Sequence, residues 1–168
     1  TTNDCVAVGF NALKVNTVAD NTALGSEAGL VNTTGTITAV GAGALDANTT
    51  GTANTAVGTD ALGANITTAD CTAIGFNALL KSTAITGNTA IGARALAANT
   101  IGDKNTAIGI DALGENDFQS ACTAVGFNAL LKCTALDITA VGFYALRNNT
   151  TGTANTAVGA SALRSNVS

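Results

Sequence analysis

The chain has 168 residues, of which 46% are hydrophobic and only 11% are charged, and its net charge is −4. Aromatic residues make up 4% and Trp and Met are absent, so a core must be built from Ala and aliphatic side chains. Because there is no His, a Ser-His-Asp triad, a Cys-His pair and any His-ligated metal site are excluded. The sequence predicts one domain, 1–168, with no enzymatic activity, cofactor or metal. Seven scattered Lys and Arg residues form no basic stripe, which argues against a nucleic-acid partner.

A short motif, Ala-(Val/Ile/Leu)-Gly-x-x-Ala, recurs ten times at intervals of 16 or 17 residues. Its glycines are Gly9, Gly25, Gly41, Gly58, Gly75, Gly92, Gly109, Gly126, Gly142 and Gly159. This period is too short for helix-pair repeats, which need about 33 residues or more, but it suits one coil of a flattened β-solenoid. We therefore predict an all-β parallel β-solenoid, or β-roll, of about ten coils, with a length of about 48 Å at a strand spacing of about 4.8 Å.

Each coil begins with a predicted strand that ends at the repeat glycine, as in the segment 55–58. Side chains alternate along a strand, so Thr and Val or Ile share one face while Ala and Gly share the other. Thr stands three residues before the glycine in nine coils, which predicts a Thr ladder along the rod. The bare Ala/Gly face predicts close packing, either inside the roll or at a seam between subunits.

After the strand, each coil continues with a second apolar segment and then a turn. An Ala three residues after the glycine is followed by Leu in nine coils, the exception being Gly29, which predicts a second buried segment. Clusters such as Asn-Thr-Thr-Gly suit the turn that closes a coil, with the repeat glycines as further structural turn positions. Amphipathic helices are disfavoured because Gly and Asn/Thr interrupt every 16 residues or so.

Six sequons for N-glycosylation fall in the turns, at Asn32, Asn48, Asn65, Asn148, Asn149 and Asn166.

Four cysteines raise the question of a disulfide bond. Cys5, Cys71 and Cys122 all lie four residues before a repeat glycine, so they share one column. They are four and three coils apart, about 19 and 14 Å, whereas the Cα atoms of a disulfide lie within about 7 Å. Cys133 lies eleven residues from Cys122 in the same coil, which makes Cys122–Cys133 the candidate disulfide, with a bond from Cys133 to another chain as the alternative. Otherwise the thiols are predicted to be small buried side chains.

Phe follows the repeat glycine directly in the three coils whose strand begins with Cys, as Phe10, Phe76 and Phe127. These rings either form contact surfaces for a partner or fill a corner of the roll or a subunit seam. Aromatic residues are densest between Phe127 and Tyr144. Phe127, Phe143 and Tyr144 are therefore the candidate partner-contact residues.

Units such as 54–62 and 88–96, with the pattern Asn-Thr-Ala-(Val/Ile)-Gly-x-x-Ala-Leu, resemble the head repeats of trimeric autotransporter adhesins and the similar repeats of phage-type tail-fibre shafts. The resemblance covers essentially the whole chain. It implies a left-handed roll, three chains around a common axis, an extracellular place on a cell or virion surface, and a protein or glycan receptor. The chain departs from that family in its longer Asn-Thr-Thr-Gly turns and in its four cysteines.

We therefore expect a non-enzymatic structural and adhesive fibre segment that forms a homotrimeric rod. Two alternatives are a filament of rods stacked end to end and a monomeric solenoid that binds ice or glycan. The filament is suggested because the coils at Gly9 and Gly159 carry no helix, Pro or charge cluster to block pairing of their strand edges. No apolar run of about 18 residues and no signal-peptide pattern is present, so the expected location depends on the resemblance.

Overall fold

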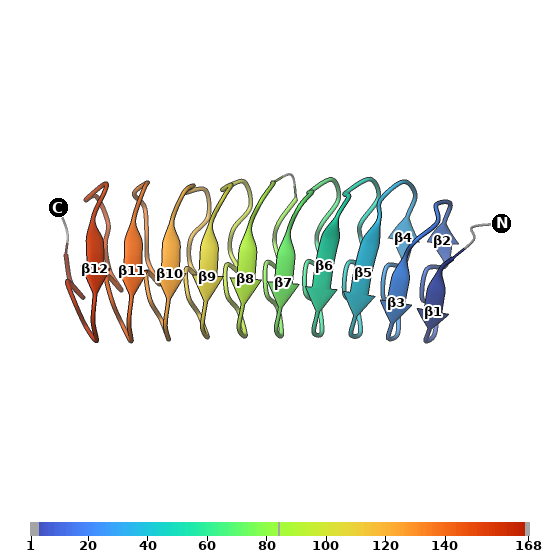
Figure 1. Cartoon of the computed structure of the whole chain (residues 1–168), viewed down its shortest axis with the longest axis horizontal. Helices are drawn as coiled ribbons and strands as arrows, with labels where there is room; N and C mark the ends of the chain where they lie inside the picture. The colour runs from blue at the N-terminus through green and yellow to red at the C-terminus, as the bar shows by residue number, and fades with distance from the viewer. Residues whose placement is uncertain (1–3, 84, 167–168) are drawn as a thin grey trace.

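In the computed structural model, which describes residues 4–83 and 85–166, the chain winds into a straight parallel β-solenoid. Ten strands, one from each repeat, lie side by side in a single sheet in the order β1-β3-β5-β6-β7-β8-β9-β10-β11-β12. Figure 1 shows them stacked along the rod, with the two termini at opposite ends. The predicted all-β solenoid is thus confirmed, with about nine turns of about 17 residues.

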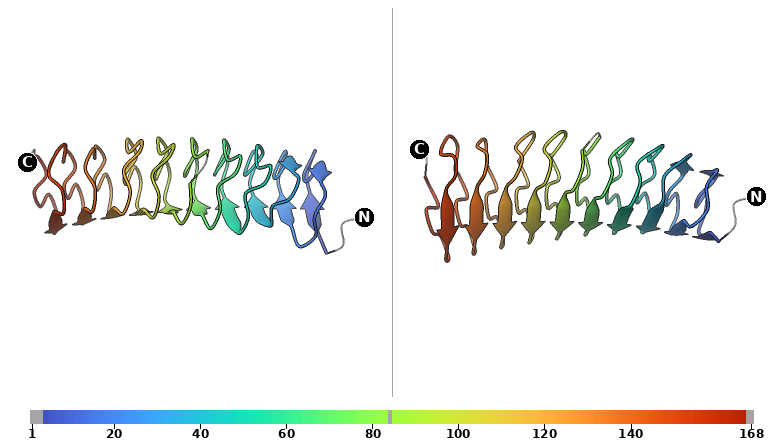
Figure 2. Two further views of the ribbon diagram at one scale, coloured as in Figure 1. Left: turned by 90° about the horizontal axis from the view of Figure 1, so that it is seen from above. Right: turned by 45° about the horizontal axis from the view of Figure 1, so that its top comes forward.

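The strands are short, because most residues of each coil lie in turns. Those of the main sheet are β1 (Val6–Val8), β3 (Thr22–Leu24), β5 (Ile37–Val40), β6 (Asn54–Val57), β7 (Thr72–Ile74), β8 (Thr89–Ile91), β9 (Thr106–Ile108), β10 (Thr123–Val125), β11 (Thr139–Val141) and β12 (Thr156–Val158). A second, two-stranded sheet joins β2 (Val15–Asn16) to β4 (Val31–Asn32). In Figure 2 the main sheet forms one side of the rod, and the return segments form the other.

Equivalent residues of neighbouring coils pair in register. Thr72 lies beside Thr89, Ala73 beside Ala90 and Ile74 beside Ile91, and the same pairing is kept wherever the spacing is 16 rather than 17 residues. Each residue therefore lies between two residues that occupy the same place in the repeat, one in the previous coil and one in the next. Each column of the repeat becomes a column of side chains along the rod.

The alanines of the strands point into the roll. Ala90 is 0% exposed, as are its counterparts from Ala23 to Ala140, and the Ala-Leu pairs of the second segment, such as Ala95 and Leu96, lie against them in one continuous core. The Thr residues of the strands and the aliphatic residues directly before the repeat glycines point outward. Of the two alternatives for the bare Ala/Gly face, the structure shows packing inside the roll, where its alanines form one core with the Leu residues of the second segment.

The repeat glycine lies where successive coils approach most closely. The ten repeat glycines have φ between 127° and 140°, a region that side-chain-bearing residues rarely adopt. A Cβ atom on Gly92 would lie 2.5 Å from the carbonyl oxygen of Gly109 in the next coil. The close approach that requires glycine thus runs along the rod from coil to coil, and not sideways to a second sheet.

The Leu of the second segment lies in a left-handed backbone conformation. Leu45 and Leu96 both have φ of 51°, and Gly29 has φ of 57° in the one coil that lacks this Leu. The conformation costs about 1–2 kcal/mol for a residue with a side chain, whereas burying Leu contributes about 1.5–3 kcal/mol. Leu is tolerated because its burial offsets the backbone cost, and Gly29 avoids that cost.

Two columns of asparagine are buried at the edges of the core. Seven residues after the repeat glycine, the amide Nδ2 of Asn48 donates to Oδ1 of Asn32 at 2.9 Å, and that of Asn65 donates to Oδ1 of Asn48 at 2.8 Å. Four residues before the glycine, Asn88 accepts from the backbone N–H of Asn105 at 2.7 Å. Four of the sequon asparagines belong to the first column and are 0% exposed: Asn32, Asn48, Asn65 and Asn149. A glycan on any of these four would require the coil to open.

We predict that Gly92→Ala destabilises the fold by about 3 kcal/mol or more, since it combines a disfavoured φ with a backbone clash. Gly63 is the matched control, because it has no positive φ and its added Cβ would lie 3.3 Å from the nearest atom. Gly63→Ala should cost about 1 kcal/mol or less. Denaturant unfolding followed by circular dichroism measures both, and equal stability of the two variants would contradict the coil-contact role of the repeat glycine.

Candidate functional site

The outward face of the main sheet carries a continuous column of aliphatic side chains, which we call the apolar stripe. Its members stand directly before the repeat glycines: Val8, Leu24, Val40, Val57, Ile74, Ile91, Ile108, Val125, Val141 and Val158. Val8, Leu24, Ile74, Ile108 and Val158 are between 38% and 71% exposed, and the other five are half-buried. Contiguous apolar surfaces are rare on monomeric soluble proteins, and where one occurs it is typical of an interaction face.

A column of threonine runs beside the apolar stripe. Thr22 and Thr89 are half-buried and Thr38 is exposed, so the predicted Thr ladder lies at the outer surface of the sheet. The two columns together make one face of β-branched side chains at the regular strand spacing of about 4.8 Å.

The phenylalanines that follow the repeat glycines point outward at the ends of the strands. Phe10 is 72% exposed and Phe76 is 51% exposed. The interpretation that these rings fill a corner of the roll is therefore wrong.

Phe127, Phe143 and Tyr144 come together in space, as their sequence density suggested. The ring centroids of Phe127 and Phe143 are 5.6 Å apart and stacked at 15°, and that of Tyr144 lies 4.1 Å from Phe143. Two guanidinium groups lie over Tyr144: that of Arg164 at 4.7 Å and that of Arg147 at 5.2 Å from its centroid. We call these five residues the aromatic–arginine cluster.

Acidic residues gather in the corresponding turns near the other end of the rod. Burial raises the pKa of Asp46, and the neighbouring charges of Asp60 and Glu27 raise it further. The segment 15–80 contains five acidic residues and no Lys or Arg. In the middle of the rod the signs alternate, and Arg94 forms an ion pair with Asp111 of the next coil at 2.6 Å, which raises the pKa of Arg94.

Cys122 and Cys133 face each other across the interior of one coil. Both thiols are directed to the carbonyl oxygen of Ala135, at 3.6 Å from Cys122 Sγ and 3.2 Å from Cys133 Sγ. A hydrogen bond between the two thiols lowers the pKa of Cys122 to about 7 and raises that of Cys133. Both side chains are buried, so the geometry favours a bond within the coil over one from Cys133 to another chain.

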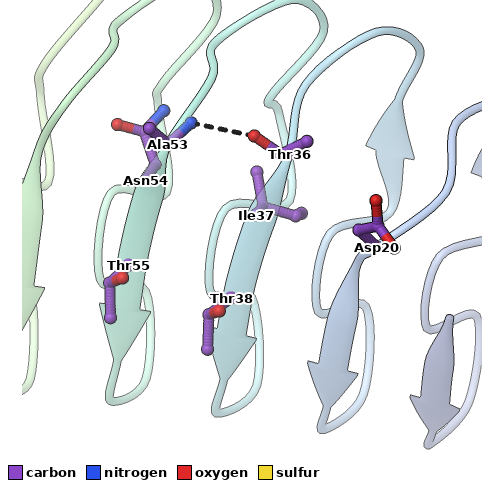
Figure 3. A pocket seen from close by; sticks show the side chains of 7 residues that line it. All are labelled: Asp20, Thr36, Ile37, Thr38, Ala53, Asn54 and Thr55. Carbon is purple, nitrogen blue, oxygen red and sulfur yellow. Dashed lines mark hydrogen bonds between the residues drawn. The ribbon is translucent and has the colours of Figure 1, made fainter. Parts of the chain in front are cut away.

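A shallow groove of about 220 Å³ lies beside the first strands of the rod (Figure 3). It is lined by Asp20, Thr36, Ile37, Thr38, Ala53, Asn54 and Thr55. Its inner polar groups are already engaged: Thr36 Oγ1 accepts from the N–H of Ala53 at 3.2 Å, and the Asn54 amide donates to the carbonyl of Thr68 at 2.7 Å. Asp20 is the only charged residue in the lining, so the groove offers no paired groups for acid–base chemistry.

Within residues 4–83 and 85–166, no three His, Cys, Asp or Glu side chains lie close enough to hold a metal ion. That part of the chain also contains no helix that is both long and apolar enough to cross a bilayer.

Comparisons of the chain with protein-family models, with curated proteins and with solved structures return no match. The parallel solenoid itself is compatible with a β-roll repeat.

We predict that oxidation joins Cys122 to Cys133. In the unreduced, denatured chain, two of the four cysteines should then accept an alkylating reagent, and all four should do so after reduction. The bond closes a short loop, which stabilises the fold by about 3 kcal/mol. Cys122→Ser should abolish the reduction-dependent change and Cys71→Ser, the matched control, should keep it. Alkylation of all four thiols without reduction would contradict the pairing.

Proposed function

We propose that the chain is a non-enzymatic structural and adhesive fibre segment whose rods associate through the apolar stripe into a homotrimer. The observation that carries the proposal is the stripe itself, a column of exposed and half-buried aliphatic side chains along the whole main sheet. At about 25 cal/mol for each Å² of apolar surface removed from water, covering a strip that spans every coil supplies a substantial driving force for association.

Three chains, rather than two, follow from the resemblance of the repeat to trimeric adhesin heads and tail-fibre shafts. An extracellular place on a cell surface or virion, and a receptor of protein or glycan, follow from the same resemblance. The long parallel sheet supports a spacer role, because each added repeat lengthens the rod by one strand spacing without altering its cross-section.

A charge in the middle of the apolar stripe should disrupt the trimer. Ile108→Lys places an ammonium group on the outward face, where it costs little in the single rod but must be desolvated in an interface. Light scattering should give three chains for the parent and one for this variant. Ile66→Lys is the matched control, because Ile66 is comparably exposed but lies in a turn away from the stripe, and it should remain trimeric. A monomeric parent would refute the trimer, and an open polymer would favour the end-to-end filament.

A second function, ice binding by a monomer, is favoured by one specific observation. The Thr column and the apolar stripe form a flat and regular two-column face on a single parallel sheet. An array of hydroxyl and methyl groups at constant spacing is able to order water into a lattice.

The two functions predict different freezing behaviour of a solution of the protein. If the face binds ice, the monomeric chain should depress the freezing point relative to the melting point and inhibit ice recrystallisation, and Thr89→Lys should abolish both effects. Absence of both effects in the parent chain would exclude this second function.

A further inference from the structure

The aromatic–arginine cluster presents a hydrophobic surface to solvent. Phe127 and Phe143 stack nearly in parallel from adjacent coils, and they remain 38% and 51% exposed. Phe10 occupies the same position of its own coil, but no other aromatic ring among the described residues contacts it. The cluster is thus a locally built surface and not a general consequence of the repeat.

Among the described residues, no carboxylate pairs with the two guanidinium groups of the cluster. Arg147 and Arg164 occupy the same position of adjacent coils, so two like charges are neighbours in one column. The two ion pairs found among the described residues involve neither of them, and Nε of Arg147 is buried without a hydrogen-bond partner. Between residues 123 and 166 the only acidic residue is Asp137, which lies at the other end of β11 from Phe143. The described part of the chain therefore supplies these two guanidinium groups with no carboxylate partner.

We infer that the aromatic–arginine cluster binds an acidic glycan through the carboxylate of a sugar unit. A guanidinium group donates two parallel N–H hydrogen bonds to a carboxylate, and stacking on Tyr144 holds both guanidiniums in place for this contact. The exposed ring of Phe143 packs against the C–H face of the same sugar, which is the apolar side of a pyranose ring. This assignment rests on the proposed adhesive role and gives that role a ligand class.

The acidic turns of a second copy are the competing occupant. Glu27, Asp46 and Asp60 carry the complementary charge. However, they offer no flat apolar surface to the exposed rings of Phe127 and Phe143. A carboxylated sugar matches both halves of the cluster, the guanidiniums and the rings, whereas the acidic turns match only one.

The test measures binding of two pairs of probes to the full chain by calorimetry. The pairs are polygalacturonate oligomers against their methyl esters, and sialyllactose against lactose, which separate uronic from sialic acids as the source of the carboxylate. At least one acidic probe should bind and its neutral counterpart should not. Arg164→Gln should weaken binding about tenfold or more, since a hydrogen-bonded charge is lost. Phe143→Ala should also weaken it.

The matched controls occupy the same positions in the first coil. Lys14→Gln and Phe10→Ala remove a charge and a ring outside the cluster and should leave binding unchanged, with circular dichroism verifying that each variant is folded. Equal losses in Lys14→Gln and Arg164→Gln, or no binding of either acidic probe, would overturn the inference. Salt-sensitive self-association that Arg164→Gln abolishes, without glycan binding, would assign the cluster to a second copy. Light scattering on the same samples tests the trimer separately.

Discussion

The structure depends on hydrogen bonding between successive coils over nearly the whole repeat, and not only within the strands. The N–H of Gly58 donates to Val40 at 2.7 Å, that of Leu45 to Ala61 at 3.1 Å, and that of Thr49 to Ile66 at 3.1 Å, and these bonds lie in three different parts of the coil. The backbones of neighbouring coils are therefore held at one spacing all the way round. Each side chain must be compatible with a copy of its own column on both sides.

This constraint explains why the buried columns are nearly uniform in sequence and why the surface columns vary. Inside, the main columns consist of Ala, of Leu or of Asn, and the column of Asn48 bonds to itself because an amide is both donor and acceptor. The exceptions in the column of Asn48 are Ser82 and Cys133, which lie in the coils whose strands directly follow Cys71 and Cys122. On the surface, side chains can differ from coil to coil without a change in the backbone. Differences in charge and aromatic content between coils are therefore confined to the outer columns.

The period alone was sufficient to predict the parallel solenoid, because only a coil of this length brings ten copies of one motif into register. It could not assign the two faces of the strand, since alternation separates Ala from Thr without saying which faces the core. The size of the roll decides this: Ala fits opposite Leu45, so Thr and Val face outward. The Asn residues of clusters such as Asn-Thr-Thr-Gly are predicted as turn residues because Asn is common in turns. Their recurrence seven residues after eight of the ten repeat glycines is the signal for a buried column.

Charge in a stacked column has consequences that depend on the order of signs. Arg94 and Asp111 are adjacent in one column and neutralise each other at 2.6 Å. Like charges also meet across columns: Asp46 stands five residues after its glycine and Glu27 and Asp60 stand two residues after theirs, and the pKa of Asp46 is raised by burial and by these two charges. Arg147 and Arg164 are two like charges one coil apart in one column, and the face of Tyr144 partly compensates both. A fold built from nearly identical coils thus concentrates uncompensated charge where neighbouring repeats carry the same sign, and there an external ion of opposite charge gains the most.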